Sequence, residues 1–272
     1  MVIRILEVEM QIGICAWVLP VDVMESFSVV SQLGLEGLVI DYEEELRADS
    51  LDWSARCELY RENSAKYKVE IPTLALNQLC NKGMTQKSNE GYAKELLHHS
   101  IETAAKIGAS KIQVPSFYDN LIRSEADLQQ TIDLLKYACE VGERKGIYIG
   151  SESVMTINEH KAVYEAVKSK ALMTLFDTQN PWRMMNQDGL RIGAYMLPNV
   201  GELHAKDSRD HGSKSLQLGQ GDVSYKEIMD LFVKAGYNDW IQLESAYNQM
   251  DDYEARIKKD IQLIKRSFIN RR

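Results

Sequence analysis

Short apolar segments alternate with longer amphipathic segments along the whole of the 272-residue chain. The short segments are rich in Val, Ile and Leu and are bounded by turn residues, which is typical of buried parallel strands. We predict strands at 11–17, 35–41, 69–76, 109–116, 146–152, 171–177, 199–207 and 239–244.

The longer segments carry helix signals. One stops at Gly108, and another begins with the letters SEAD, which resemble a capping box, and stops at Gly146. Asp52 is a candidate N-cap for an earlier helix. We predict helices at 52–67, 90–107, 124–145, 222–235 and 251–268.

Eight strand–helix units in a chain of this length predict an α/β protein built as a single (β/α)8 TIM barrel. An open doubly wound sheet is the competing architecture. It is disfavoured because no GxGxxG turn follows the first strand and because polar residues stand at the ends of many strands. No linker or low-complexity tract divides the chain, so we expect one domain over residues 1–272. Residues 1–9 precede the first strand, and we interpret them as an N-terminal extension or a start-site artefact.

The formal net charge of -8 argues against nucleic acid and anionic membranes as partners. Four cysteines without a CxxC pair favour neither a zinc site nor a disulfide framework, and they fit a reducing cytoplasm. The first ten residues lack the apolar core of a signal peptide, and no apolar run is long enough to cross a bilayer. We therefore expect a cytoplasmic protein.

Four consecutive predicted strands each deliver a potential metal ligand near their carboxyl ends. In a barrel of this type such positions face the active site. The residues are Glu152, Asp177, His204 and Glu244.

Three carboxylates placed close together repel one another and raise one another's pKa, and a divalent cation removes that conflict. The oxygen-rich set suits Mn²⁺, Mg²⁺ or Co²⁺, and Zn²⁺ is also compatible. We expect one divalent ion, with Mn²⁺ first among the candidates. The alternative interpretation is a set of separate structural ion pairs, for example Lys206 with Glu244 or Asp207.

Several segments give the chain a resemblance to a known family. They are SLDWSARCELY (50–60), SES (151–153), FDTQN (176–180), LHAKDSR (203–209), LGQGDVSY (218–225) and IQLES (241–245). From about residue 11 to 265 the chain resembles the xylose-isomerase-like sugar isomerase and epimerase superfamily. Within it, the chain looks most like the L-ribulose-5-phosphate (L-xylulose-5-phosphate) 3-epimerases.

This resemblance implies that Glu152, Asp177, His204 and Glu244 are metal ligands. It also implies that Glu152 and Glu244 are the catalytic acid/base pair. Such enzymes take a proton from the carbon beside a carbonyl and return one on the opposite face, through a cis-enediolate that the metal stabilises. The expected partner is a small sugar or sugar phosphate, and the family relation suggests a homo-oligomer.

Five residues are candidates for substrate binding. Asn180 could bind a hydroxyl group or cap a helix before Pro181, and Lys206 and Arg209 could bind phosphate or pair with neighbouring aspartates. Trp17 could wall the pocket, as could Trp53 and Trp182, although large aromatic residues are core residues by default. Glu159 and its neighbour His160 could line the pocket or face solvent at the start of a helix. The five candidates are Asn180, Lys206, Arg209, Trp17 and Glu159.

The chain departs from the epimerase pattern at three places. The Ser-x-His expected near the end of the third strand is replaced by Asn77-Gln78-Leu79, and the Asp-x-Gly-Asn after the sixth strand lacks its glycine in 177–180. The first strand region around Trp17 lacks the charged residue expected for a phosphorylated sugar. These changes leave the predicted metal site intact but leave the substrate open.

Three alternative functions follow from the same residues. The metal site could serve dehydration of a keto-inositol or β-elimination from a 3-keto-glycoside. Phosphodiester cleavage, as in endonuclease IV relatives, is disfavoured by the small number of histidines, five, and by the acidic charge. A non-catalytic sugar-binding barrel or subunit is the remaining alternative.

Overall fold

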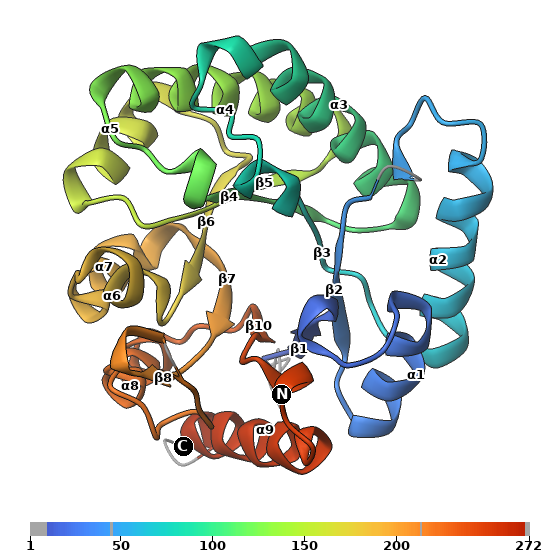
Figure 1. The fold of residues 1–272 in the computed structure, drawn as a ribbon, viewed down its shortest axis with the longest axis vertical. Helices are drawn as coiled ribbons and strands as arrows, with labels where there is room; N and C mark the ends of the chain where they lie inside the picture. The colour runs from blue at the N-terminus through green and yellow to red at the C-terminus, as the bar shows by residue number, and fades with distance from the viewer. Residues whose placement is uncertain (1–9, 44–45, 213, 270–272) are drawn as a thin grey trace, which may run out of the picture.

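A closed barrel of eight parallel strands forms the centre of the molecule, with helices around it (Figure 1). The computed structural model describes residues 10–43, 46–212 and 214–269. Going around the barrel, the strands follow the order β1-β10-β7-β6-β5-β4-β3-β2. This confirms the predicted TIM barrel. The expected N-terminal extension, residues 1–9, lies outside the described residues.

The barrel strands are shorter than the predicted segments, because the sequence pattern includes turn residues on either side. They are β1 (Ile12–Cys15), β2 (Gly37–Asp41), β3 (Thr73–Ala75), β4 (Lys111–Ser116), β5 (Tyr148–Ser153), β6 (Leu172–Asp177), β7 (Val200–Ala205) and β10 (Trp240–Leu243). A short hairpin, β8 (Ser208–Arg209) and β9 (Lys214–Ser215), follows β7 outside the barrel.

The helices that surround the barrel include all five that the sequence pattern predicts, and further ones that it does not. They are α1 (Val23–Leu33), α2 (Trp53–Tyr67), α3 (Glu90–Ile107), α4 (Glu125–Lys145), α5 (Ile157–Val167), α6 (Asn180–Met185), α7 (Gly189–Met196), α8 (Tyr225–Lys234) and α9 (Tyr253–Ile269). None of these helices, as far as the chain is described, has the length and apolar character needed to cross a bilayer.

Helix ends follow the local sequence in most cases. α3 and α4 stop at Gly108 and Gly146, which take left-handed conformations that glycine adopts without steric cost. Ser124 caps α4 by accepting a hydrogen bond from the backbone N–H of Asp127. The expected Asp52 cap is wrong, because its side chain makes no capping hydrogen bond and its backbone is not extended.

The barrel interior is unusually polar for this architecture, in which branched apolar side chains usually fill the centre. Lys111, Gln113, Glu202, His204 and Gln242 are all buried on barrel strands. Glycines make room for large inward side chains. A Cβ at Gly13 would lie 2.2 Å from Gln242 Oε1, and one at Gly37 would lie 2.3 Å from the Trp240 ring.

His160 is buried in α5, so the interpretation that it faces solvent is wrong. Burial lowers the pKa of its imidazole from 6.5 to about 4. In the unfolded chain the ring takes up its proton near pH 6.5, whereas the folded state resists protonation until about pH 4. Stability is therefore fully present above pH 6.5 and falls as the pH drops towards 4.

We predict that replacing His160 with Leu makes unfolding less sensitive to acid. The wild type should lose about 3 kcal/mol between pH 7 and pH 4 through this group, and His160→Leu should lose that much less. Urea unfolding of both proteins at pH 7, 5.5 and 4 measures the difference. Equal pH dependence in the two proteins would contradict the assignment.

Candidate active site

The carboxyl ends of four neighbouring barrel strands bring together the four residues predicted from the sequence. Glu152 lies in β5, Asp177 ends β6, His204 lies in β7 and Glu244 directly follows β10. Each offers one ligand atom, and these atoms all lie within 4.8 Å of one another. In the register of the sheet, Asp177 pairs with His204, which places both at the same level of the barrel.

The cluster is nearly closed to solvent. Glu152, Asp177 and His204 are buried, and the Glu244 side chain is only 10% exposed. A cleft of about 350 Å³ lies beside it, lined by Glu152, Glu244 and residues from several other elements. The cleft falls in the size range of small-molecule sites.

Both oxygens of Glu152 are held by side-chain amides. Asn180 Nδ2 donates to Glu152 Oε1 at 3.1 Å, and Gln113 Nε2 donates to Glu152 Oε2. Because a carboxylate only accepts hydrogen bonds, the amide nitrogen of Gln113 must face it. The carbonyl oxygen of Gln113 then accepts no hydrogen bond from the described residues, although it is buried in a side chain that lines the cleft.

Glu244 is held by three partners from different elements. Trp17 Nε1 donates to Glu244 Oε1 at 3.0 Å. The other oxygen lies 2.7 Å from His204 Nδ1 and 2.8 Å from Lys206 Nζ. Trp17 and Lys206 both line the cleft, as the sequence interpretation expected of substrate-contacting residues.

Asp177 uses its two oxygens differently. Oδ1 accepts the backbone N–H groups of Gln179 and Asn180 at 2.7 and 2.6 Å, which fixes the start of α6. Oδ2 accepts no hydrogen bond within the described part of the chain and lies 3.0 Å from Lys206 Nζ in an ion pair. One oxygen is therefore structural, and the other points to the charge cluster.

The charges of the cluster shift one another's protonation. Burial raises the pKa of Glu152, with a further contribution from the charge of Glu244. Burial also acts on Glu244, but Lys206 and His204 outweigh it and hold the pKa of Glu244 well below its usual range. The neighbouring carboxylates, led by Glu244, likewise overcome burial to raise the pKa of His204.

Cys15 lies at the edge of the cluster, since its sulfur belongs to a group with His204 and Glu244 that meets the same 4.8 Å spacing. Burial and the nearby carboxylates raise the pKa of its thiol. The four cysteines of the chain are free thiols.

Two substrate-binding candidates lie away from the cleft, which corrects the sequence interpretation. The chain turns into the β8–β9 hairpin after β7, and this carries Arg209 to the surface, where it donates to Gln220 O at 2.8 Å and lies 3.6 Å from Asp222 Oδ1. Glu159 forms a reciprocal capping box with Thr156 at the start of α5.

Two of the three tryptophans considered as pocket walls make contacts elsewhere instead. Trp53 donates from its indole to Thr103 Oγ1 at 2.9 Å, between α2 and α3. Trp182 stacks on His211 with ring centroids 4.6 Å apart. Neither lines the cleft, whereas Trp17 does.

The sequence interpretation missed two polar residues on barrel strands. Gln113 holds Glu152, and Glu202 lies 3.3 Å from His204 Nε2. A signal for both was present, because side chains two residues apart on a strand share a face. Glu202 stands two residues before His204, and Gln113 stands two residues before Pro115, which pairs in register with Glu152.

With the fold and the cluster described, comparison with known proteins gives the family. The family model for the xylose isomerase-like TIM barrel matches residues 27–267. The chain belongs to the xylose isomerase-like TIM barrel family. The resemblance seen in the sequence is confirmed at this level, and the specific likeness to L-ribulose-5-phosphate 3-epimerases stays a prediction.

Relatives and solved structures cover almost the whole chain. A 2-epi-5-epi-valiolone 7-phosphate 2-epimerase from an Actinoplanes species is 25% identical over 269 residues, which is 96% of each chain. A structure of an L-ribulose 3-epimerase covers 96% of this chain and 95% of its own with a TM-score of 0.78 and 15% identity. A family member from Mycobacterium smegmatis in complex with magnesium has a TM-score of 0.71 at 18% identity, with 91% and 88% covered.

We predict that Lys206→Met destabilises the protein by about 3 kcal/mol, because it leaves Asp177 and Glu244 buried with one cation fewer. The matched control is Lys226→Met, which removes an exposed lysine that pairs with the half-buried Asp230 one turn along α8 and should cost less than about 1 kcal/mol. Urea unfolding at one pH measures both. Equal, small losses of unfolding free energy in the two variants would show that Lys206 does not compensate the buried charges of Asp177 and Glu244.

Proposed function

We propose that this protein is a divalent-metal-dependent epimerase or isomerase of a ketose or ketose phosphate. The observation that carries the proposal is the convergence of two glutamates, an aspartate and a histidine in one buried cluster beside a cleft. Membership in the xylose isomerase-like family and an epimerase among the relatives support it.

The donor atoms of the cluster fit a divalent cation. Three carboxylates and one imidazole form a mostly hard ligand set, and Asp177 Oδ2 accepts no hydrogen bond from the described residues. We propose Glu152, Asp177, His204 and Glu244 as the ligands, with Mn²⁺ as the first ion to test and Co²⁺, Mg²⁺ and Zn²⁺ after it. When bound, the cation supplies electrostatic stabilisation of the negative charge that develops on the substrate oxygens.

The protein's own residues provide the proton transfers. Glu152 and Glu244 come from β5 and β10, which are separated in the barrel by β6 and β7, so their carboxylates approach from different walls. One takes the proton from the carbon beside the carbonyl, and the other returns a proton on the opposite face, through a cis-enediolate of the substrate. Asn180 and Gln113 fix the orientation of one carboxylate and Trp17 that of the other.

The cleft also offers groups for the rest of the substrate. The carbonyl oxygen of Gln113 is placed to accept a hydrogen bond from a substrate hydroxyl. Arg183 on α6 lines the same cleft and would suit an anionic substituent such as a phosphate. This role replaces the one expected of Arg209.

The same cluster could serve dehydration or β-elimination, because both begin with proton abstraction next to a carbonyl. One structural neighbour at 13% identity, a probable 3-DHS dehydratase from Bacillus anthracis, shares the fold with a TM-score of 0.71. Product mass separates these reactions, since epimerisation conserves mass and dehydration removes water.

We predict that the purified protein binds about one equivalent of divalent metal and that Asp177→Asn loses it. The amide keeps an oxygen that can accept the hydrogen bonds at the start of α6, so the fold should survive while one anionic ligand is removed. Elemental analysis and calorimetric titration with Mn²⁺ measure the loss, with Asp230→Asn, a half-buried aspartate of α8 outside the cluster, as control. Full metal content in Asp177→Asn would remove Asp177 from the ligand set.

We further predict that Glu152→Gln and Glu244→Gln each lower epimerase activity at least about 100-fold, because each removes one proton-transfer group. The assay incubates ketoses and ketose phosphates in D₂O and counts deuterium at the inverted carbon. Glu165→Gln on the exposed face of α5 is the matched control and should keep full activity. Turnover without deuterium exchange, or undiminished activity in both site variants, would reject the proposed mechanism.

A further inference from the structure

Beneath the charge cluster, a second group of buried polar residues fills the barrel interior. Glu202 and Lys111 lie on β7 and β4, and both side chains are almost fully buried, at 0% and 5% exposed. Glu202 does not line the cleft, so it cannot touch a substrate there. Burying two charges in a barrel is costly unless they are paired and hydrogen-bonded, so their shared neighbours indicate what they do.

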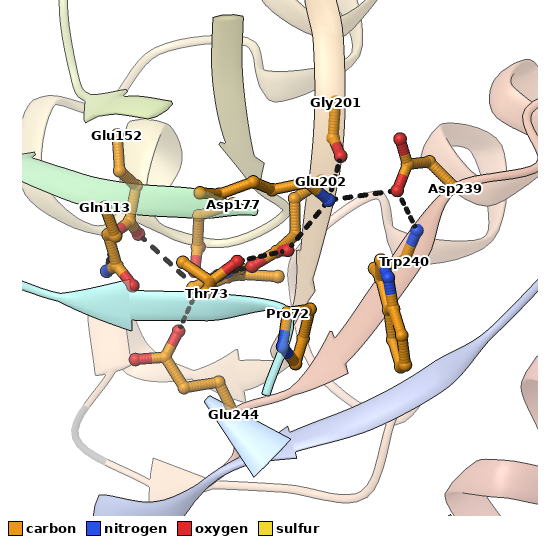
Figure 2. Close-up of polar contacts among 12 residues, drawn as sticks. Pro72, Thr73, Gln113, Glu152, Asp177, Gly201, Glu202, Asp239, Trp240 and Glu244 are labelled. Atoms are coloured by element: carbon orange, nitrogen blue, oxygen red, sulfur yellow. Dashed lines mark hydrogen bonds and ion pairs between the residues drawn. The ribbon is translucent and has the colours of Figure 1, made fainter. Parts of the chain in front are cut away.

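The two oxygens of Glu202 face different partners. Oε2 accepts a hydrogen bond from the Thr73 hydroxyl at 2.7 Å (Figure 2). The same oxygen lies 3.3 Å from Lys111 Nζ, and Oε1 lies 3.3 Å from His204 Nε2. Lys111 also donates to Gly201 O at 2.9 Å and to Asp239 Oδ1 at 3.0 Å. Thr73 and Lys111 therefore hold one oxygen of the Glu202 carboxylate, and the other oxygen is directed at His204 of the cluster.

This arrangement determines which nitrogen of His204 faces the cluster. A carboxylate has no proton to donate, so Nε2 donates to Glu202 and, in the metal-free protein, Nδ1 donates to Glu244. Nδ1 is the nitrogen that faces the cluster, 2.7 Å from Glu244 and 4.0 Å from Glu152, so a cation bound there would take the place of the Nδ1 proton. A ligating histidine commonly gives its other ring N–H to a carboxylate, and loss of that carboxylate typically costs 10–100-fold in metal affinity.

We propose that Glu202, anchored by Lys111 and Thr73, is a positioning residue that accepts the Nε2–H of His204 and so holds the ring with Nδ1 directed into the cluster as a metal ligand. The proposal rests on the proposed metal site for its second half only. The first half concerns the protein's own hydrogen bond and holds or fails without any metal.

The test uses Glu202→Gln, which keeps the shape of the side chain but can donate to Nε2 as well as accept from it. The matched control is Asp260→Asn, because Asp260 is an equally buried carboxylate, bonded to Tyr247 Oη at 2.7 Å and Leu218 N at 3.1 Å, far along the chain on α9. A general effect of replacing a buried carboxylate would appear in both variants.

The first readout is ¹⁵N NMR of the histidine rings in the metal-free protein, with the His204 signals assigned by their loss in His204→Gln. The wild type should show a proton bonded to Nε2, and Glu202→Gln should shift or lose that signal while Asp260→Asn keeps it. A wild-type His204 with no proton on Nε2 would overturn the proposal whatever the metal does.

The second readout is the Kd for Mn²⁺, measured by calorimetry. We expect a rise of about 10–100-fold in Glu202→Gln and no change in Asp260→Asn. If Glu202→Gln does not fold, Thr73→Val removes one donor to Glu202 and should raise the Kd by a smaller factor. An unchanged Kd in the folded variant would overturn the role in metal binding.

The two readouts separate the possible failures. A wild type that shows the Nε2 proton but binds no divalent ion would reject the proposed metal-dependent function and the second half of this inference together, while the first half would stand. A wild type that binds Mn²⁺ with equal affinity in both variants would leave the proposed function in place and reject only the role of Glu202.

Discussion

The site depends on gathering three carboxylates and an imidazole in a volume almost closed to water. Like charges at such distances cannot all ionise without positive charge nearby, and the described residues supply it through Lys206 and His204. Burial disfavours the charged form of both glutamates and raises the pKa of Glu152, whereas the pKa of Glu244 is lowered because Lys206 and His204 contact it directly and outweigh burial. The need for positive charge is also the physical argument for a divalent cation.

The barrel stabilises this concentration of charge because residues outside the cluster form hydrogen bonds with the charged side chains and hold them in place. Asn180 and Gln113 bind one glutamate, Trp17 binds the other, and Glu202 contacts the histidine from below. These partners come from different strands and loops, so the geometry of the cluster depends on closure of the whole barrel.

The fold and the cluster could be predicted from the sequence because both follow from strand periodicity. Short apolar runs located the strands, and polar residues at their carboxyl ends located Glu152, Asp177, His204 and Glu244. Arg209 could not be placed in the same way, because the hairpin after β7 redirects the chain by tertiary contacts such as that between Arg209 and Gln220. The pattern Thr-x-x-Glu that ends at Glu159 is a readable capping box, so its structural role was available from the sequence.

The buried polar residues deeper in the barrel can be found in the sequence only if the whole inward face of each strand is considered. Considering only the last residues of each strand overlooks Glu202 and Gln113, which lie one pleat deeper on the inward face. Their polarity would have marked that face as something other than an apolar core. The contact of Glu202 with Lys111, 91 residues away along the chain, could not be foreseen without the closed barrel.

The two carboxylate oxygens of Asp177 have different roles, and this limits which residues can replace it. One oxygen organises the first turn of α6, which carries Arg183 and Met184 to the cleft wall, while the other belongs to the charge cluster. A glutamate would carry the charge on a longer arm and lose the local geometry, and an asparagine would keep the geometry and lose the charge. Only aspartate meets both requirements. A substitution at this position therefore changes the cleft wall that α6 forms, the charge of the cluster, or both.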